Sequence, residues 1–126
     1  MLKSAAGLLA LPIAAVTSAQ DSPDGYSLEA PAYYFNEAMS RCQIDTACLK
    51  LELSKADREL NEVYRARFSY LPKSKYAGLR DAERAWIASR DKDCSWLSSS
   101  RDRFFYMCML ESTINRKYWL LRNIGD

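Results

Sequence analysis

One stretch of the chain, LRDAERAWIASRDKDC from Leu79 to Cys94, has the pattern of a single amphipathic helix and restricts the folds open to the remainder. With 3.6 residues per turn, one broad face of this helix collects a mixed set of side chains: Leu79, Ala82, Glu83, Trp86, Ile87, Arg90 and Cys94. Glu83 and Arg90 therefore lie beside Trp86 on the packing side, where a charge without a partner is strongly unfavourable. Neighbouring helices must supply those partners, which predicts a helical bundle.

A second helix is predicted upstream of this stretch. It begins at Asp45 or Thr46, either of which can cap the first amides, and continues to about Tyr70 before Pro72 stops it. Its apolar residues repeat with the helical period: Leu49, Leu53, Ala56, Leu60, Val63, Tyr64 and Leu71. The short turn of residues 71–74 should make the two helices antiparallel neighbours.

A third helix is predicted from about Phe104 to Asn123, after a polar loop at residues 98–103. Trp119 projects away from its packing face, which consists of Met107, Leu110, Ile114, Tyr118 and Leu121. The chain is therefore predicted to be all-α. We expect a small antiparallel bundle, built from a helical hairpin and a third helix.

The first 19 residues have the pattern of a secretory signal peptide. One Lys precedes an apolar run from Ala5 to Val16, and small residues follow at positions 17–19. The run is too short for a comfortable membrane span, and no cysteine near the cleavage position could accept a lipid. We expect residues 1–19 to be cleaved and the protein to be periplasmic or secreted, with no membrane span.

Residues 20–41 are predicted to form a leader, polar as far as Pro31 and then aromatic. The segment AYYFNEAM, from Ala32 to Met39, holds three adjacent aromatic residues at positions 33–35. We favour their packing on the outside of the bundle near the first cysteines, and a binding lip is the alternative. The helical domain itself is predicted to span residues 42–126.

All four cysteines lie in the part of the chain predicted to be exported. An even number in an oxidising compartment indicates two disulfides, each contributing roughly 2–4 kcal/mol to stability. Three pairings are possible. We favour Cys42 with Cys48 and Cys94 with Cys108, because each pair brackets a predicted turn or helix end.

Composition argues against several classes of function. The chain has no His and no CxxC spacing, so no metal site or cofactor is expected, and a formal net charge of +2 does not indicate nucleic-acid binding. A glycosidase could pair Glu83 with Asp57 or Glu111, but so small a bundle offers little cleft. Glu83 and Asp57 are better explained as ion-pair partners of Arg90 or Arg67. No catalytic residue is therefore assigned.

A structural polar cluster is predicted between the first two helices. Asp57 and Asn61 are four residues apart and neighbour Tyr64, and Arg90 has the donors to satisfy them. We expect these four side chains to gather beside Trp86. Their predicted role is to fix the register of the helices rather than to perform chemistry.

Several of these residues also fall into a recurring pattern. The pattern comprises AD at 56–57, LN at 60–61 followed by Tyr64, RAW-x-x-x-RD-x-x-C at 84–94, and a final Cys108 with Thr113 and Arg116. In this the chain resembles the LprI-like lysozyme-inhibitor family, from Cys42 to Leu121. The resemblance implies a small exported helical domain that is not an enzyme and whose eponymous member inhibits lysozyme.

The chain departs from that family at three points. It lacks the lipid-accepting cysteine of the eponymous lipoprotein, its first two cysteines are closer together, and it has Glu83 where many relatives have Gln. The lipid anchor is therefore not carried over.

A protein partner is expected, possibly lysozyme or another cell-wall hydrolase. The predicted contacts are Ser99, Arg101 and Arg103 in the loop before the third helix, since a muramidase cleft carries two carboxylates. Trp119 is a further predicted contact, although the aromatic segment could instead cover it. The alternative function is a periplasmic structural or immunity-type interaction protein that does not inhibit lysozyme.

Overall fold

The computed structural model describes residues 29–124, and these form an all-α bundle, as predicted. Its four α-helices are α2 (Ala30–Cys42), α3 (Thr46–Arg67), α4 (Tyr76–Leu97) and α5 (Arg103–Asn123). Two 3-10 turns, η1 (Phe68–Tyr70) and η2 (Lys73–Lys75), connect α3 to α4. Within residues 29–124, every helix is too short or too polar to span a bilayer. The predicted signal peptide and residues 20–28 of the predicted leader lie outside the described residues.

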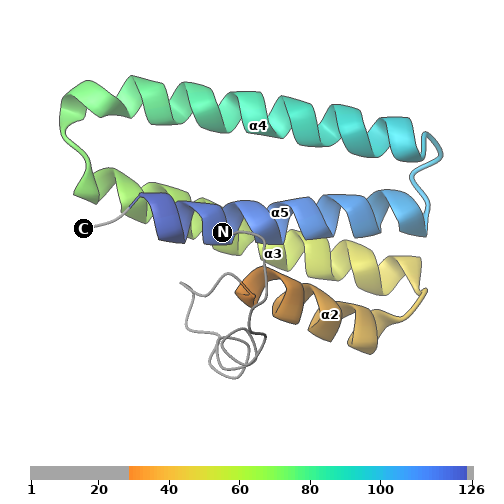
Figure 1. Cartoon of the computed structure of the whole chain (residues 1–126). Coiled ribbons are helices and arrows are strands. Elements are labelled where there is room, and N and C mark those ends of the chain that lie inside the picture. Colours follow the sequence, from red (N-terminus) through yellow and green to blue (C-terminus); the bar gives the residue numbers. More distant parts are fainter. Residues whose placement is uncertain (1–28, 125–126) are drawn as a thin grey trace, which may run out of the picture.

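The helices run alternately up and down, so α3 and α5 are parallel to one another (Figure 1). Among the described helices these two form the most extensive contact, and α2 and α4 lie on opposite sides of the pair. The α2–α3 turn and the α4–α5 loop are therefore at one end of the bundle. The η1–η2 connection and the end of α5 lie at the other.

Local sequence explains where α3 and α5 begin. Asp45 accepts hydrogen bonds from the backbone amides of Ala47 and Cys48, and Asp102 accepts them from the two amides that follow Arg103. Both are N-caps, which satisfy amides that have no partner within the helix. The observed bounds of α3, α4 and α5 agree with the predicted helices to within about three residues.

Helix α2 was not predicted: residues 30–41, expected to belong to the leader, are helical. Pro31 occupies its first turn, where the missing amide hydrogen costs nothing. Small side chains at Ala30 and Ala38 are almost fully buried and let α2 approach the α3–α5 pair closely. Of the three aromatic residues in this segment, Phe35 packs against the core and Tyr34 stacks on the buried Tyr118 ring.

Helix α5 is central, and more of it is buried than the predicted face. Leu110, Ile114 and Tyr118 lie in the core as expected. A second set of α5 side chains is also buried: Phe105, Met109, Thr113 and Leu120. The reason is that α5 contacts helices on three sides, α2, α3 and α4.

Helix α4 packs differently from the hairpin predicted. It lies antiparallel to α3 but contacts mainly α5. Ala82 and Ile87, placed on its packing face by the helical period, are consequently exposed. The buried side chains of α4 are Leu79, Glu83 and Cys94, with Trp86 and Arg90 partly buried.

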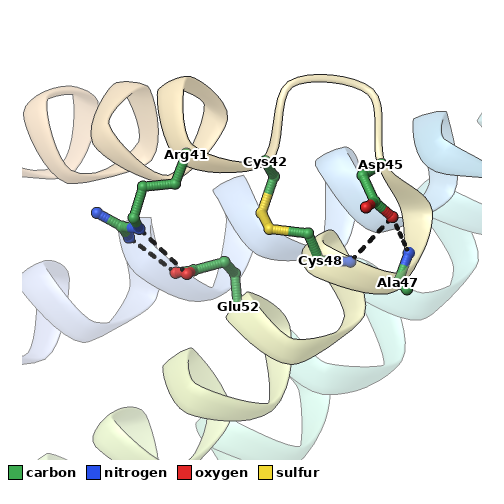
Figure 2. Close-up of a disulfide and its surroundings, with 6 residues drawn as sticks. All are labelled: Arg41, Cys42, Asp45, Ala47, Cys48 and Glu52. Carbon is green, nitrogen blue, oxygen red and sulfur yellow. Dashed lines mark hydrogen bonds and ion pairs between the residues drawn. A yellow bond between two sulfur atoms is a disulfide. The ribbon is translucent and has the colours of Figure 1, made fainter.

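Two disulfides cross-link the bundle in the favoured pairing. Cys42 and Cys48 are bonded with their Cα atoms 5.3 Å apart, and Cys94 and Cys108 with theirs 5.5 Å apart. Figure 2 shows the first bond closing the α2–α3 turn. Beside it, the Arg41 guanidinium donates two hydrogen bonds to the Glu52 carboxylate, at 3.2 and 2.9 Å. Covalent and ionic contacts thus hold the start of α3 to the end of α2.

Candidate functional site

The end of the bundle that carries both disulfides exposes an unusual amount of apolar surface. Trp96 is 87% exposed, Ile44 69%, Leu97 59% and Phe104 48%. Ile44 lies in the α2–α3 turn, and the other three flank the α4–α5 loop. We call these four residues the apolar tip. Large exposed apolar side chains that gather in one region commonly mark a protein-binding surface.

The loop beside the tip is ordered by a single carboxylate. Asp102 accepts hydrogen bonds from the Ser98 hydroxyl at 2.8 Å, from the Ser100 hydroxyl at 3.3 Å and from the Phe104 and Phe105 amides at 3.0 and 3.3 Å. The hydrogen bond from Ser98, followed by those from the two amides, lowers the pKa of Asp102 below its ordinary value. At neutral pH the loop is therefore held by an ionised cap.

The structure places two predicted contact residues, Ser99 and Arg101, in this loop and a third, Arg103, at the first position of α5. Ser99, Arg101 and Arg103 are all exposed. The Arg101 guanidinium lies 5.1 Å from the centre of the Phe105 ring, and the Arg103 guanidinium lies 4.7 Å from the centre of the Phe104 ring. Both charges are thus positioned by aromatic rings while staying accessible.

Two residues at this end have a backbone conformation that side chains disfavour. Gln43, in the α2–α3 turn, and Arg101, in the α4–α5 loop, both have φ of 55°. They are the non-glycine residues with positive φ in the described part of the chain. Such conformations cost about 1–3 kcal/mol and persist where the surroundings fix them. A disulfide closes each of these two connections.

Trp119, the fourth predicted contact, is not part of the tip. It lies near the end of α5, on the side chain of Arg116, with 4.1 Å between the guanidinium and the ring centre. Trp119 is 37% exposed, and the predicted aromatic segment does not stack on it, since Tyr34 stacks on Tyr118 instead. Trp119 therefore belongs to a separate surface.

The structure brings Arg90 into contact with Asp57 between α4 and α3. Arg90 donates to Asp57 at 3.2 Å, to Asp91 at 3.0 Å and to the Thr113 hydroxyl at 2.9 Å, and its guanidinium lies 5.0 Å from the centre of the Trp86 ring. The Thr113 contact from α5 was not expected. Arg90 therefore ties α4 to both α3 and α5.

Glu83 has a different partner from the one predicted. Its carboxylate accepts a hydrogen bond at 2.8 Å from Arg116 of α5 and not from Arg90 or Arg67. Arg67 is buried at the end of α3, where its guanidinium lies over the Tyr70 ring and its Nε has no hydrogen-bond partner in the described chain. Glu83 faces α5 because α4 packs on that helix.

A groove of about 550 Å³ separates α3 from α4, and it holds the rest of the predicted polar cluster. Asn61 and Tyr64 line it with Asp57 and Trp86, although no hydrogen bond joins Asn61 or Tyr64 to Arg90. Burial, followed by the nearby Glu83 charge, raises the pKa of Tyr64, so its hydroxyl is neutral at pH 7. The residues of the predicted cluster thus line both sides of an open groove, Asp57, Asn61 and Tyr64 from α3 and Trp86 and Arg90 from α4.

Sequence reasoning missed Trp96 and Leu97, the most exposed members of the tip on α4. Both follow the last buried residue of that helix, Cys94, and precede a run of serines. An apolar pair beyond the last packed turn of a helix has no neighbour to cover it, and that position was the available signal. Among the described residues no group of His, Cys, Asp and Glu could hold a metal ion.

Comparison with known protein families gives a match. Neither a search of curated proteins nor a search of solved structures found a similar protein. A scan against protein families matched residues 36–120 to the family described as Lysozyme inhibitor LprI. The matched region runs from within α2 almost to the end of α5, so it contains most of the bundle, both disulfides and the α4–α5 loop. The chain therefore belongs to the LprI lysozyme-inhibitor family.

Proposed function

We propose that this protein binds a muramidase or a related cell-wall hydrolase and blocks its cleft with the disulfide end of the bundle. The observation that carries the proposal is the apolar tip, in which Trp96 is 87% exposed beside two accessible arginines. Membership of a family of lysozyme inhibitors supports a hydrolase as the partner and a role other than catalysis.

The chemistry of the tip suits such a cleft. A glycosidase cleft carries two carboxylates, and the guanidinium groups of Arg101 and Arg103 are donors that can pair with them. Trp96 and Leu97 supply apolar area, and tryptophan and arginine are the residue types enriched in energetically dominant contacts. Groups of both kinds therefore lie at one connection, on the end of α4, the α4–α5 loop and the start of α5.

The tip is also organised before it binds. The Cys94–Cys108 bond and the Asp102 hydrogen bonds hold the loop, so little conformational entropy is lost when a partner binds it. Export completes the proposal: residues 1–19 act as a cleaved signal peptide that delivers the protein to the compartment where cell-wall hydrolases work.

The test is inhibition of several lysozyme types by the oxidised chain from Gln20 to Asp126, assayed on cell-wall substrate. Trp96→Ser and the pair Arg101→Gln with Arg103→Gln should each weaken inhibition at least tenfold, because removal of a central contact commonly costs about 2 kcal/mol or more. Both changes affect exposed side chains, so the circular dichroism spectrum and melting temperature should stay as they are.

Two further variants locate the contact surface. Tyr70→Ser removes an exposed aromatic ring at the opposite end of the bundle and should leave inhibition unchanged. Trp119→Ser tests the separate surface on α5. If Trp119→Ser loses inhibition while Trp96→Ser inhibits fully, the contact surface is on α5, and the proposal that the apolar tip binds the hydrolase is refuted. Absence of inhibition by the folded wild-type protein at micromolar excess would refute the hydrolase partner.

A further inference from the structure

The groove between α3 and α4 is a second, separate surface with its own chemistry. Its side on α3 is formed by residues 57–64 and its side on α4 by residues 80–90. Ten residues of helix correspond to a length of about 15 Å. The groove is open because α4 packs on α5 and makes little contact with α3. Its volume of about 550 Å³ is within the range of ligand sites.

The charges in the groove do not cancel. The two carboxylates that line it, those of Asp57 and Glu83, are already held by Arg90 and Arg116. Arg84 has no ion pair within residues 29–124, and Arg80 has only an exposed contact of 3.7 Å with the adjacent Asp81. Arg80 and Arg84 are four residues apart, which places them one above the other on α4. The groove therefore presents two guanidinium groups for anions.

Besides these charges, the groove contains apolar surface and polar groups that have no hydrogen-bond partner in the described chain. Leu60 forms part of the floor, and Ile87 is 42% exposed beside it. The Asn61 amide and the Tyr64 hydroxyl make no hydrogen bond to another described residue, so both can bind a ligand. An occupant that fits must bring carboxylates, an apolar side chain and peptide-like polar groups.

From these features we infer that the α3–α4 groove binds an acidic amphipathic helix of a protein partner. Two carboxylates one helical turn apart would match Arg80 and Arg84, and an apolar side chain on the same face would contact Leu60 and Ile87. A sugar fits less well, because the guanidinium groups of Arg90 and Arg116 already lie over the Trp86 ring, at 5.0 and 5.7 Å from its centre. This site is independent of the tip and of the proposed hydrolase inhibition.

The experiment uses a fluorescein-labelled helical peptide of about 15 residues, long enough to form some helix in water. Its binding face carries two Glu residues four apart and Leu residues next to them, and a matched peptide has Gln in place of both Glu residues. Fluorescence anisotropy should show binding of the Glu peptide that weakens as salt is added, because exposed charges are screened. The Gln peptide should bind at least tenfold more weakly.

Variants of the protein then place the peptide. Arg84→Gln should lower the affinity about 5- to 10-fold, as expected for loss of one charge-assisted contact. Lys92→Gln removes an exposed positive charge from the same helix outside the groove and should have no effect. Arg84 has no ion pair to lose, so the variant should fold, and the NMR signals of the Trp86 indole and the Asn61 side chain should shift on binding to the wild type.

The inference is overturned if neither peptide binds, if the Gln peptide binds equally well, or if Lys92→Gln is as damaging as Arg84→Gln. It is also overturned if the free protein is a dimer in sedimentation that Arg84→Gln dissociates, because a second copy would then occupy the groove. Trp96→Ser should retain peptide binding. That result separates a failure of the groove from a failure of the tip.

Discussion

At the scale of single residues, we expect stability to be most sensitive to mutation at the ion pair between Glu83 and Arg116. Their side chains are only 8% and 12% exposed and are joined at 2.8 Å. Arg116→Leu should destabilise the protein by about 3–5 kcal/mol, because it leaves the Glu83 carboxylate buried without a partner. Urea unfolding followed by circular dichroism measures the change.

The matched control is the double variant in which Glu83→Leu accompanies Arg116→Leu. It should recover most of the lost stability, since no charge is then left behind. If the single and double variants are equally unstable, the loss comes from packing of Arg116 against the two tryptophans and not from the charge.

Tyr118 provides a residue-scale test of burial through pH. It is 5% exposed and stacks on Tyr34, and burial, followed by the nearby Tyr34 and Glu59 charges, raises its pKa to about 12. A raised folded-state pKa favours the neutral phenol, so this contribution to stability is complete below pH 10 and is lost as the pH rises towards 12. Alkaline unfolding should therefore steepen in that window.

Tyr118→Phe should make stability less dependent on pH between 10 and 12, as measured by urea unfolding at each pH. In a pH titration followed by phenolate absorbance, the variant should show one tyrosine fewer than the wild type among those that ionise near pH 12. A Tyr118→Phe protein with the same pH dependence as the wild type would show that another group governs alkaline unfolding.

At the scale of helices, the sequence predicts three of the four well. Helices α3, α4 and α5 have apolar residues at the helical period, and Asp45 gives α3 a clear start signal as well. Helix α2 was missed because it buries small residues, Ala30 and Ala38, which leave no conspicuous apolar stripe. The second buried face of α5 was missed because a helix covered on several sides has no single stripe to detect.

Polar contacts between helices could likewise be predicted only in part. The pairing of Asp57 with Arg90 could be predicted, since both lie on predicted inner faces of adjacent helices. The pairing of Glu83 with Arg116 could not, because it depends on α4 packing on α5 instead of α3. Helical periodicity gives the face of a helix, whereas the identity of the helix opposite is a tertiary property.

The Cys94–Cys108 bond allows a prediction about how α4 is held. It closes a segment with a sequence separation of 14, for which the chain-entropy estimate gives about 3 kcal/mol. Replacing both cysteines by Ser should lower the free energy of unfolding by about that amount. It should also weaken hydrolase inhibition, because the loop beside Trp96 is no longer fixed.

The comparison is the same double replacement at Cys42 and Cys48, whose separation is only 6. Its closed segment is shorter, so the estimate falls to about 2 kcal/mol. Equal losses in both variants would show that loop length does not determine the contribution of either bond. Urea unfolding measures each loss.

At the scale of the whole molecule, the apolar tip exists only because of the topology. Ile44 and Trp96 are far apart in the sequence and reach the same end because consecutive helices alternate in direction. The sequence supported the choice of Ser99, Arg101 and Arg103 as exposed loop residues. It grouped Trp119 with them, whereas that residue lies near the end of α5, towards the other end of the bundle.

The direction of α5 also indicates where the protein can be coupled to a carrier, a dye or a surface. Helix α5 begins beside the tip and runs 21 residues away from it, a distance of about 30 Å. A carrier, dye or surface coupled behind Asn123 would therefore leave both disulfide-closed connections pointing outward. In immobilised form the molecule would present a single, defined orientation to whatever is passed over it.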